Sequence, residues 1–508
     1  MVMPKYTSSA VPIGIISMSG GLNTSASGLA LEDNESTSSQ NCDFDIFGSV
    51  LKRNGYARLN TTAFNVGATW NSLHWLELSS GTDFLMGTCG NKLAKMDSLD
   101  GIWDDITGFL TITAGNNNHM RWRTFLDTAV GTNNVDVPIK WTGTGNGAAL
   151  TVPTNLTKAK FIEVFNAYTI LAHITLSATD HKSRLYWSTI NTIETWDAAD
   201  FADIARNDGT DITGLRVLGD KMVIFKERSI WVGLFTGDAD IPFQFIMTPS
   251  SVGCIAPDSI QEVSNGLKFL SIDGFYYFDG ANSTKVSDKI TVTLDTFGRN
   301  RFSNVQSVFQ RTNNRYWSAF STSGGTTNNR CITWDSVNNA YGLYKGHNAN
   351  CFEIVHTSGE ERVYFGDYAG FVYRADTGLN DNPSGTETAI DAFHYTKWLN
   401  FNDLVDVKGI PSVYIYYQIS SSTLTFAYAY DFENADTYTQ TFTLSTSSSV
   451  YGSAVYGTDT YAATGGAIIR RDLTSRGRVV RFKFANATIG GTFRIDGLGI
   501  LGYLETYR

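Results

Sequence analysis

Cysteine is scarce in this sequence, and its pattern argues against two kinds of stabilised domain. The five cysteines are an odd number in a chain of 508 residues, and none belongs to a Cys-x-x-Cys pair. A disulfide framework or a zinc site would need cysteines in matched or closely spaced pairs. We therefore expect buried, reduced thiols, as in a protein that is made and assembled in the cytoplasm. They are Cys42, Cys89, Cys254, Cys331 and Cys351.

Charged residues and long apolar runs are also rare. Only 17% of the residues are charged, below the roughly 25% of an average soluble protein. No run approaches the roughly 18 apolar residues of a membrane helix, so no membrane-spanning segment is expected. The apolar patch at residues 10–18 contains a proline and a glycine and lacks the cleavage site of a signal peptide. In place of charge there are 47 glycines, many Ser, Thr and Asn, and 13% aromatic residues, which favour short strands joined by polar turns.

The common catalytic and metal-binding motifs are missing. The sequence has no GxxxxGK[ST], HExxH or GxSxG motif, and no two of its seven histidines have metal-ligand spacing. The acidic stretch at 199–214 lacks the regular spacing of a calcium loop. A pair of carboxylates for glycoside hydrolysis needs only to meet in space, and the sequence nominates no such pair. We therefore expect a protein that is not an enzyme, with no catalytic residue, cofactor or metal.

The net charge of −10 is unevenly distributed. Residues 460–508 carry eight Lys and Arg against three Asp and Glu, so the rest of the chain is more acidic still. An acidic chain is a poor nucleic-acid binder, because phosphate contacts need clustered basic residues. The basic stretch at 470–484 either protects an edge strand or docks a partner. Its candidate interface residues are Arg470, Arg471, Arg476, Arg478 and Arg481.

The middle of the chain repeats in shape. Apolar bursts of four to six residues alternate with Gly, Asn, Asp and Ser turns, and one strand landmark can be chosen for each unit. The intervals between landmarks are 45, 46, 44, 46, 57 and 39 residues. A period near 45 in an all-β chain is typical of four-stranded propeller blades, although two β-sandwiches with evenly spaced strands remain an alternative. The landmarks are Met96, Trp141, Trp187, Trp231, Tyr277, Trp334 and Tyr373.

A turn-rich break near residue 380 divides the chain. Beyond it the strands are longer and alternate strictly between apolar and polar residues, which is typical of a β-sandwich. We predict an all-β protein with a flexible N-terminal arm at 1–39, a β-propeller of six or seven blades at 40–380, and a C-terminal β-sandwich at 385–508.

Two stretches resemble virion proteins of tailed bacteriophages. Residues 20–60 show a Gly-Gly-Leu-Asn start, a polar stretch, and then an Asn-x-Asp, Gly, Leu-x-Arg and Gly-Tyr pattern. A proline that usually precedes the last glycine is replaced here by Asn54. Residues 218–290 are similar to the matching region of the tail nozzles, or packaged-DNA stabilisation proteins, of short-tailed phages. The positions that carry the first pattern are Gly20, Gly21, Leu22, Asn23, Asn41, Asp43, Gly48, Leu51, Arg53, Gly55 and Tyr56.

The resemblance implies a structural protein of the virion tail, assembled in the host cytoplasm. It implies a homohexameric ring below the portal and its adaptor proteins, in contact with tail fibre or needle proteins. Packaged DNA would pass through this ring without sequence-specific binding and be retained until ejection. The hairpin at 41–59 would close the propeller as an outer strand pair. We add its Asn41, Lys52 and Arg53 to the candidate partner interface.

Two other functions remain open from the sequence. One is a propeller that binds or cleaves glycans, in which aromatic side chains would stack on sugar rings, although packing between blades is the simpler role for such residues. The other is a receptor-binding component at the tail tip. The aromatic candidates are Trp187, Trp196, Trp231, Tyr276 and Tyr277.

Overall fold

The chain folds into two compact units that are both built from β-strands. The computed structural model describes residues 11–45, 48–357, 359–433, 437–445 and 466–505. One unit holds Ala57–Cys331 and Gly346–Ala375, and the other holds Met1–Tyr56, Ile332–Lys345 and Asp376–Arg508. Regular helix in the described residues is limited to α1 (Thr291–Asp295) and the short 3-10 helices η1 (Pro257–Ser259), η2 (Asp288–Ile290) and η3 (Arg299–Asn304).

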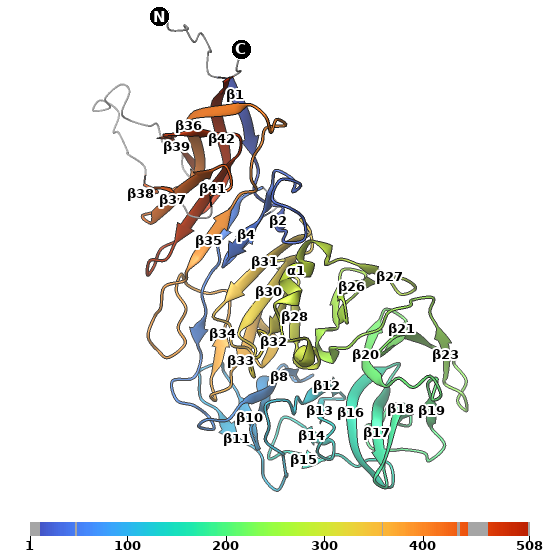
Figure 1. Cartoon of the computed structure of the whole chain (residues 1–508). Helices are drawn as coiled ribbons and strands as arrows, with labels where there is room; N and C mark the ends of the chain where they lie inside the picture. Colours follow the sequence, from blue (N-terminus) through green and yellow to red (C-terminus); the bar gives the residue numbers. More distant parts are fainter. Residues whose placement is uncertain (1–10, 46–47, 358, 434–436, 446–465, 506–508) are drawn as a thin grey trace, which may run out of the picture. The chain divides into compact units, whose positions relative to one another are not determined.

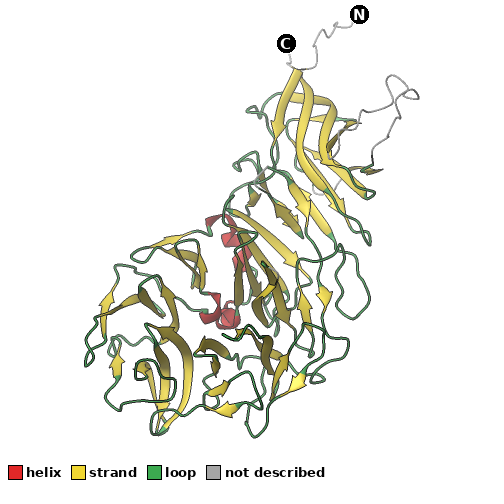
Figure 2. Cartoon of the chain, turned by 180° about the vertical axis from the view of Figure 1, so that it is seen from behind, coloured by secondary structure: helices red, strands yellow, loops and turns green. Residues whose placement is uncertain are grey.

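Four-stranded antiparallel sheets, each with its strands in chain order, make the first unit a β-propeller (Figures 1 and 2). The first six sheets are β8 (Trp70–Glu77), β9 (Asp83–Cys89), β10 (Lys92–Met96), β11 (Asp104–Asp105); β12 (Arg121–Phe125), β13 (Thr128–Thr132), β14 (Ile139–Trp141), β15 (Ala148–Ala149); β16 (Leu156–Phe165), β17 (Tyr168–Leu176), β18 (Thr179–Trp187), β19 (Phe201–Asp203); β20 (Ile212–Leu218), β21 (Lys221–Lys226), β22 (Ile230–Phe235), β23 (Phe243–Met247); β24 (Gln261–Val263), β25 (Gly266–Ser271), β26 (Gly274–Phe278), β27 (Ser283–Lys285); and β28 (Gln306–Gln310), β29 (Arg315–Phe320), β30 (Arg330–Asp335), β31 (Ala340–Lys345). Of the last of these, residues 332–345 are counted with the other unit.

A seventh sheet closes the propeller with a strand from the start of this unit. It consists of β32 (Cys351–Thr357), β33 (Glu360–Gly366), β34 (Val372–Arg374) and β7 (Ala57–Arg58), where Tyr373 pairs with Arg58. The first strands of the sheets neighbour one another around the hub. Of the stretch 41–59 that was expected to close the propeller, Ala57–Arg58 (β7) does complete the ring, whereas the residues before it lie elsewhere.

Sequence explains the blades locally. The second strand of each sheet lies between two others, and β17 is buried along almost its whole length, in keeping with six apolar residues among the nine of Tyr168–Leu176. Several hairpins turn through two residues with positive φ, as at Asn166–Ala167 and Ser177–Ala178. That pair of conformations is the type I′ turn, whose twist matches the strands it joins.

The second unit is a β-sandwich made of two sheets. One follows the order β39 (Gly466–Asp472), β36 (Val407–Gln418), β42 (Arg494–Glu505), β6 (Val50–Lys52), β5 (Cys42–Phe44), with β1 (Val11–Ile16) on β42 and β40 (Arg476–Gly477) on β36. The other follows the order β38 (Tyr438–Thr443), β37 (Thr423–Tyr430), β41 (Val480–Asn486), β35 (Ala392–Tyr395), β4 (Ser38–Gln40). A short parallel pair, β2 (Gly21–Leu22) with β3 (Glu35–Ser36), accompanies them.

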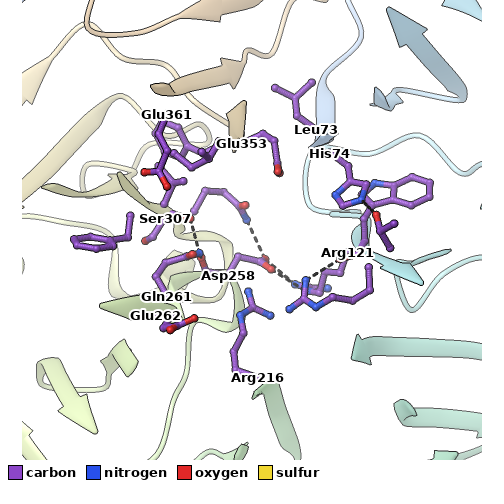
Figure 3. A pocket seen from close by; sticks show the side chains of 18 of the residues that line it. Leu73, His74, Arg121, Arg216, Asp258, Gln261, Glu262, Ser307, Glu353 and Glu361 are labelled. Atoms are coloured by element: carbon purple, nitrogen blue, oxygen red, sulfur yellow. Dashed lines mark hydrogen bonds and ion pairs between the residues drawn. The ribbon is translucent and has the colours of Figure 1, made fainter. Parts of the chain in front are cut away.

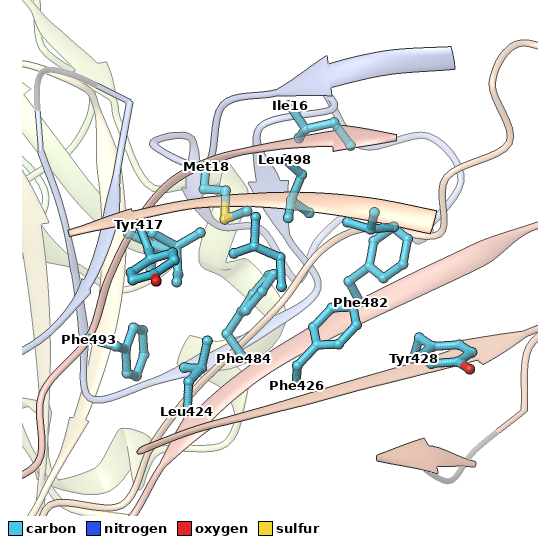
Figure 4. Close-up of a cluster of buried hydrophobic side chains, with 14 of the residues drawn as sticks. Ile16, Met18, Tyr417, Leu424, Phe426, Tyr428, Phe482, Phe484, Phe493 and Leu498 are labelled. Carbon is cyan, nitrogen blue, oxygen red and sulfur yellow. The ribbon is translucent and has the colours of Figure 1, made fainter. Parts of the chain in front are cut away.

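One hydrophobic core fills the sandwich (Figure 4). Phe426, Phe482 and Phe484 from the five-stranded sheet meet Leu498 and Ile16 from the other sheet, and all are buried. Along β41 apolar and polar residues alternate, and along β37 every second residue from Leu424 to Tyr430 belongs to the core, so each strand presents one face to it.

The N-terminal residues differ from the expected arrangement. Of the predicted flexible arm at 1–39, residues 1–10 lie outside the described residues, and residues 11–39 supply β1, β2 and β3 and begin β4. The hairpin of β5 and β6 joins the sandwich, since β6 pairs with β42. The strands of this polar leader pair with strands that are remote in sequence: β1 pairs with β42, and β4 pairs with β35. The propeller thus begins at residue 57, and the sandwich takes residues from both sides of it.

Gly55, between β6 and β7, is predicted to tolerate no side chain. A Cβ there would lie 1.8 Å from the carbonyl oxygen and 2.4 Å from the carbonyl carbon of Asn380, both backbone atoms. We expect Gly55→Ala to lower the free energy of unfolding by about 1–3 kcal/mol, as overpacking does. The control is Gly14→Ala in the same unit, where a Cβ meets nothing within 4 Å. Urea denaturation of both variants tests this, and equal midpoints would contradict it.

Candidate functional site

Three of the predicted interface residues lie inside the sandwich unit. Asn41, Lys52 and Arg53 are buried. Arg53 forms a two-pronged ion pair with Asp381, at 2.8 and 2.7 Å, and its Nε donates to Asn41 Oδ1 at 2.9 Å. Lys52 donates to Asn486 Oδ1 at 2.7 Å. Burial, with the neighbouring charge of Arg53, lowers the pKa of Lys52 to about 8. The basic pair holds the unit together and offers no exposed surface to a partner.

The five arginines of the basic stretch are placed differently from one another. Arg470, Arg476 and Arg478 are exposed, on β39, on β40 and just after it. Arg471 is half-buried and lies 4.0 Å from the ring centre of Phe442. Arg481 is half-buried between two aromatic rings, 4.5 Å from that of Tyr395 and 4.7 Å from that of Trp398. The first three are thus the exposed members of the stretch, and Arg470 pairs there with the equally exposed Asp472 at 2.9 Å.

β39 stands at the end of its sheet. Within the described residues it pairs with β36 alone, from Ser412 opposite Asp472 to Gln418 opposite Gly466. Its outward residues include Arg470 and Ile468, the latter 47% exposed. This strand therefore combines an open hydrogen-bonding edge with basic and apolar side chains.

The aromatic residues considered for glycan stacking contribute mainly to blade packing. Trp187 is buried in a hydrophobic cluster, and Trp231 packs against the same cluster. Trp196 and Tyr276 pack against the clusters of neighbouring blades. Tyr277 is half-buried on β26. They form no shared exposed platform in this arrangement.

The hub of the propeller contains a polar cavity that the sequence did not reveal. It measures about 490 Å³ and is lined mainly by residues of the first strands, together with Asp258 of η1, Arg311 after β28 and Glu361 of β33. Two arginines of β12 project into it because they stand two positions apart on one strand face. Figure 3 shows the side chains that converge there from different blades. Those that carry the argument below are Arg121, Arg123, Arg216, Asp258 and Glu353.

Two ion pairs bind these blades together. Arg121 meets Asp258 with both nitrogens of its fork, at 2.8 and 2.7 Å. Arg123 meets Glu163 in the same way, at 2.6 and 2.8 Å. Burial opposes the ionisation of Asp258, but Arg121 outweighs it and holds the pKa of that carboxyl below its usual value. In each pair one guanidinium faces one carboxylate through two hydrogen bonds.

Arg216 and Glu353 lie outside these pairs. Arg216 donates from Nε to the carbonyl of Ile260 and from Nη1 to that of Leu215, both at 3.1 Å. Among the described residues no ion pair joins it to a carboxylate. Burial and the charge of Arg123 lower its pKa to about 10, so it stays protonated at neutral pH. Burial raises the pKa of Glu353 to about 8, so that most of this carboxyl is neutral at pH 7.

A second cavity of about 410 Å³ shares Arg121 with the first. It is lined by residues before and within the first strands, including His119 and Lys160, and by residues that follow second strands, such as Asn134 and Glu227. Burial and the charge of Arg121 lower the pKa of Lys160 to about 8. The polar wall of the hub therefore continues past Arg121 along the first strands.

Searches for a metal site or membrane span give no candidate in the described part of the chain. No group of three or more His, Cys, Asp or Glu residues is arranged there to hold a metal ion. Nor does any helix there have the length and apolar character of a membrane span.

No family model and no curated protein matches this chain. Among solved structures, it is similar to the computationally designed Ika8 protein, with 11% identity over 63% of this chain and 100% of that one and a TM-score of 0.38. It is also similar to YCF48 from Cyanidioschyzon merolae, with 10% identity over 63% of this chain and 98% of that one and a TM-score of 0.41.

Proposed function

We propose that this chain is a non-enzymatic structural protein of a bacteriophage tail. Copies of it form a ring, a homohexamer, below the portal and its adaptor, and the ring lines or closes the DNA exit channel until ejection. The support from sequence is the pattern of residues 20–60 and 218–290. Several positions of the first pattern contribute to the packing of the sandwich unit. Arg53 is buried in an ion pair with Asp381, and the backbone of Asn380 leaves no room for a side chain at Gly55.

The observation that carries the ring is the edge of β39 that no other strand of the described residues covers. An edge strand presents unpaired backbone N–H and C=O groups that another chain can extend. Exposed Arg470, Arg476 and Arg478 gather on and beside this edge, whereas the chain as a whole carries a net charge of −10. A second copy therefore offers both a strand and an acidic surface that suit this edge. The same net negative charge favours passage of DNA without tight binding.

The molar mass of the purified full chain tests the ring. By light scattering we expect six times the chain mass of 55.8 kDa, either alone or after addition of portal-adaptor rings. The double variant Arg470→Glu/Arg478→Glu is expected to reduce the mass to that of one chain. The control is Arg206→Glu, whose side chain is 70% exposed in the propeller unit. A wild-type protein that stays a single chain with and without adaptor rings would overturn the proposal.

A further inference from the structure

We propose that the propeller hub binds a small oxyanion, a phosphate, sulfate or carboxylate group, between the guanidinium of Arg216 and the carboxyl of Glu353. In Figure 3 these two side chains point into the cavity from opposite sides, with the Arg121–Asp258 pair beside them. The site goes beyond the structural function proposed above and does not depend on it.

Among the described residues, Arg216 is the guanidinium lining the hub cavity that no carboxylate balances at ion-pair distance. The forks of Arg121 and Arg123 are each matched by one carboxylate, Asp258 and Glu163. Arg216 is held by backbone carbonyls, which orient its fork but carry no net charge. A partly buried charge without a counter-charge is costly, and a guanidinium matches the geometry of an oxyanion with two parallel N–H donors.

The ion pair at the rim does not change this balance. Arg311 also lines the cavity, but it pairs with Glu262 at 3.4 Å, and both side chains are at least half exposed. Water and salt screen such a pair strongly. Glu361, another carboxylate of the lining, accepts from the backbone N–H of Arg311 at 2.6 Å, and in the described residues it forms no ion pair with Arg216. Arg216 therefore remains without a carboxylate partner.

Glu353 suits an anion because it is mostly neutral at pH 7. A protonated carboxyl donates an O–H to an oxyanion, whereas a carboxylate would repel it. Its burial raises its pKa to about 8, even though Arg123 and Arg216 favour the charged form. The hub therefore binds an anion while Glu353 is protonated, and its affinity for the anion falls when Glu353 ionises.

Calorimetric titration of the full chain with sodium sulfate tests the site. Sulfate stays dianionic across the pH range used, and chloride maintains the ionic strength. We expect saturable binding at pH 7 that weakens at least about tenfold in Arg216→Gln, the loss of a charged hydrogen bond. Arg216→Lys keeps the positive charge but not the two parallel N–H donors, so its sulfate affinity is expected to lie between those of the wild type and Arg216→Gln. Arg206→Gln, an exposed arginine outside both hub cavities, is expected to bind as the wild type does.

Two results would overturn the site. One is no saturable heat with sulfate, inorganic phosphate or citrate. The other is equal binding by Arg216→Gln and wild type, which would mean an adventitious ion only. The order of affinity among the three probes identifies the ligand as a tetrahedral oxyanion or a carboxylate.

Measuring sulfate affinity as a function of pH distinguishes the ionisation of Glu353 from that of its neighbours. Sulfate affinity of the wild type is expected to fall between pH 7 and 9 as Glu353 ionises, and Glu353→Gln is expected to reduce this fall. Two charged neighbours, Arg123 and Arg216, stay protonated in that range. His74 stays neutral, because burial and the charge of Arg123 lower its pKa to about 3. Glu361, half-buried on β33, and His356, exposed on β32, also line the cavity.

Lys160 in the second cavity also titrates near pH 8, and its loss of charge would weaken an anion too. Lys160→Gln isolates that contribution. If Glu353→Gln leaves the whole pH dependence in place and Lys160→Gln removes it, the assignment of Glu353 is wrong.

Discussion

Replacing Arg53 with methionine is expected to lower the free energy of unfolding of the sandwich unit by about 3–5 kcal/mol, the usual result of breaking a buried ion pair from one side. The guanidinium has five N–H donors, and each has an acceptor: two go to Asp381 and one each to Asn41, Asn54 and Lys345. The side chain is only 1% exposed. Methionine would leave the Asp381 carboxylate buried without a counter-charge.

Hydrogen exchange measured by mass spectrometry resolves this effect within the chain. Amides of β41 and β42 should lose protection in Arg53→Met, while those of β17 in the propeller keep theirs. Adding Asp381→Asn should restore part of the lost amide protection, because it removes the buried carboxylate charge that Arg53→Met leaves without a partner. The control is Arg470→Met, where the exposed pair with Asp472 contributes little. If Arg53→Met matches this control, the buried pair is not what stabilises the unit.

The propeller was predictable because its repeat is a physical unit. The seven landmarks chosen for their spacing all fall on the third strands of the seven four-stranded sheets. The long interval between Tyr277 and Trp334 contains the helical segment 288–304, which is inserted between β27 and β28. One four-stranded sheet cannot bury both faces, so each blade repeats the same apolar strand pattern.

The leader was misjudged because its partners are remote in sequence. Arg53 and Asp381 are 328 residues apart, and Lys52 and Asn486 are 434 apart. No local pattern distinguishes a basic pair that will be buried by such contacts from one on a surface. A polar stretch such as 20–40 also gives no sign that its short strands are completed by other parts of the chain.

The sequence holds one local signal of the hub, although that signal alone does not predict a cavity. The alternation of Met120, Arg121, Trp122 and Arg123 places both arginines on one face of a strand and the apolar residues on the other. Which face looks into the hub depends on closure of the ring. Asp258, Arg216 and Glu353 come from three other blades, so only the folded propeller brings them near that face.

Truncating Phe482 to alanine should cost about 3–5 kcal/mol of unfolding free energy, the range for a buried phenylalanine. Phe482 is 0% exposed on β41, the strand between β37 and β35, and its ring stacks on Phe426 at 5.8 Å between centres. The core on this face joins strands from the leader and from the last hundred residues. The cavity would therefore weaken both sheets of the sandwich together.

The control for this cavity is Phe109→Ala, since Phe109 is fully exposed in the propeller unit and should change stability by less than about 0.5 kcal/mol. Urea denaturation followed by hydrogen exchange reports on the two units separately. In Phe482→Ala the amides of β1 and β42 should lose protection from hydrogen exchange together, because both strands belong to the sheet that faces Phe482. Loss of protection confined to β41 would mean that the leader strand is not held by this core. The arrangement of the N-terminal residues described above would then have to be revised.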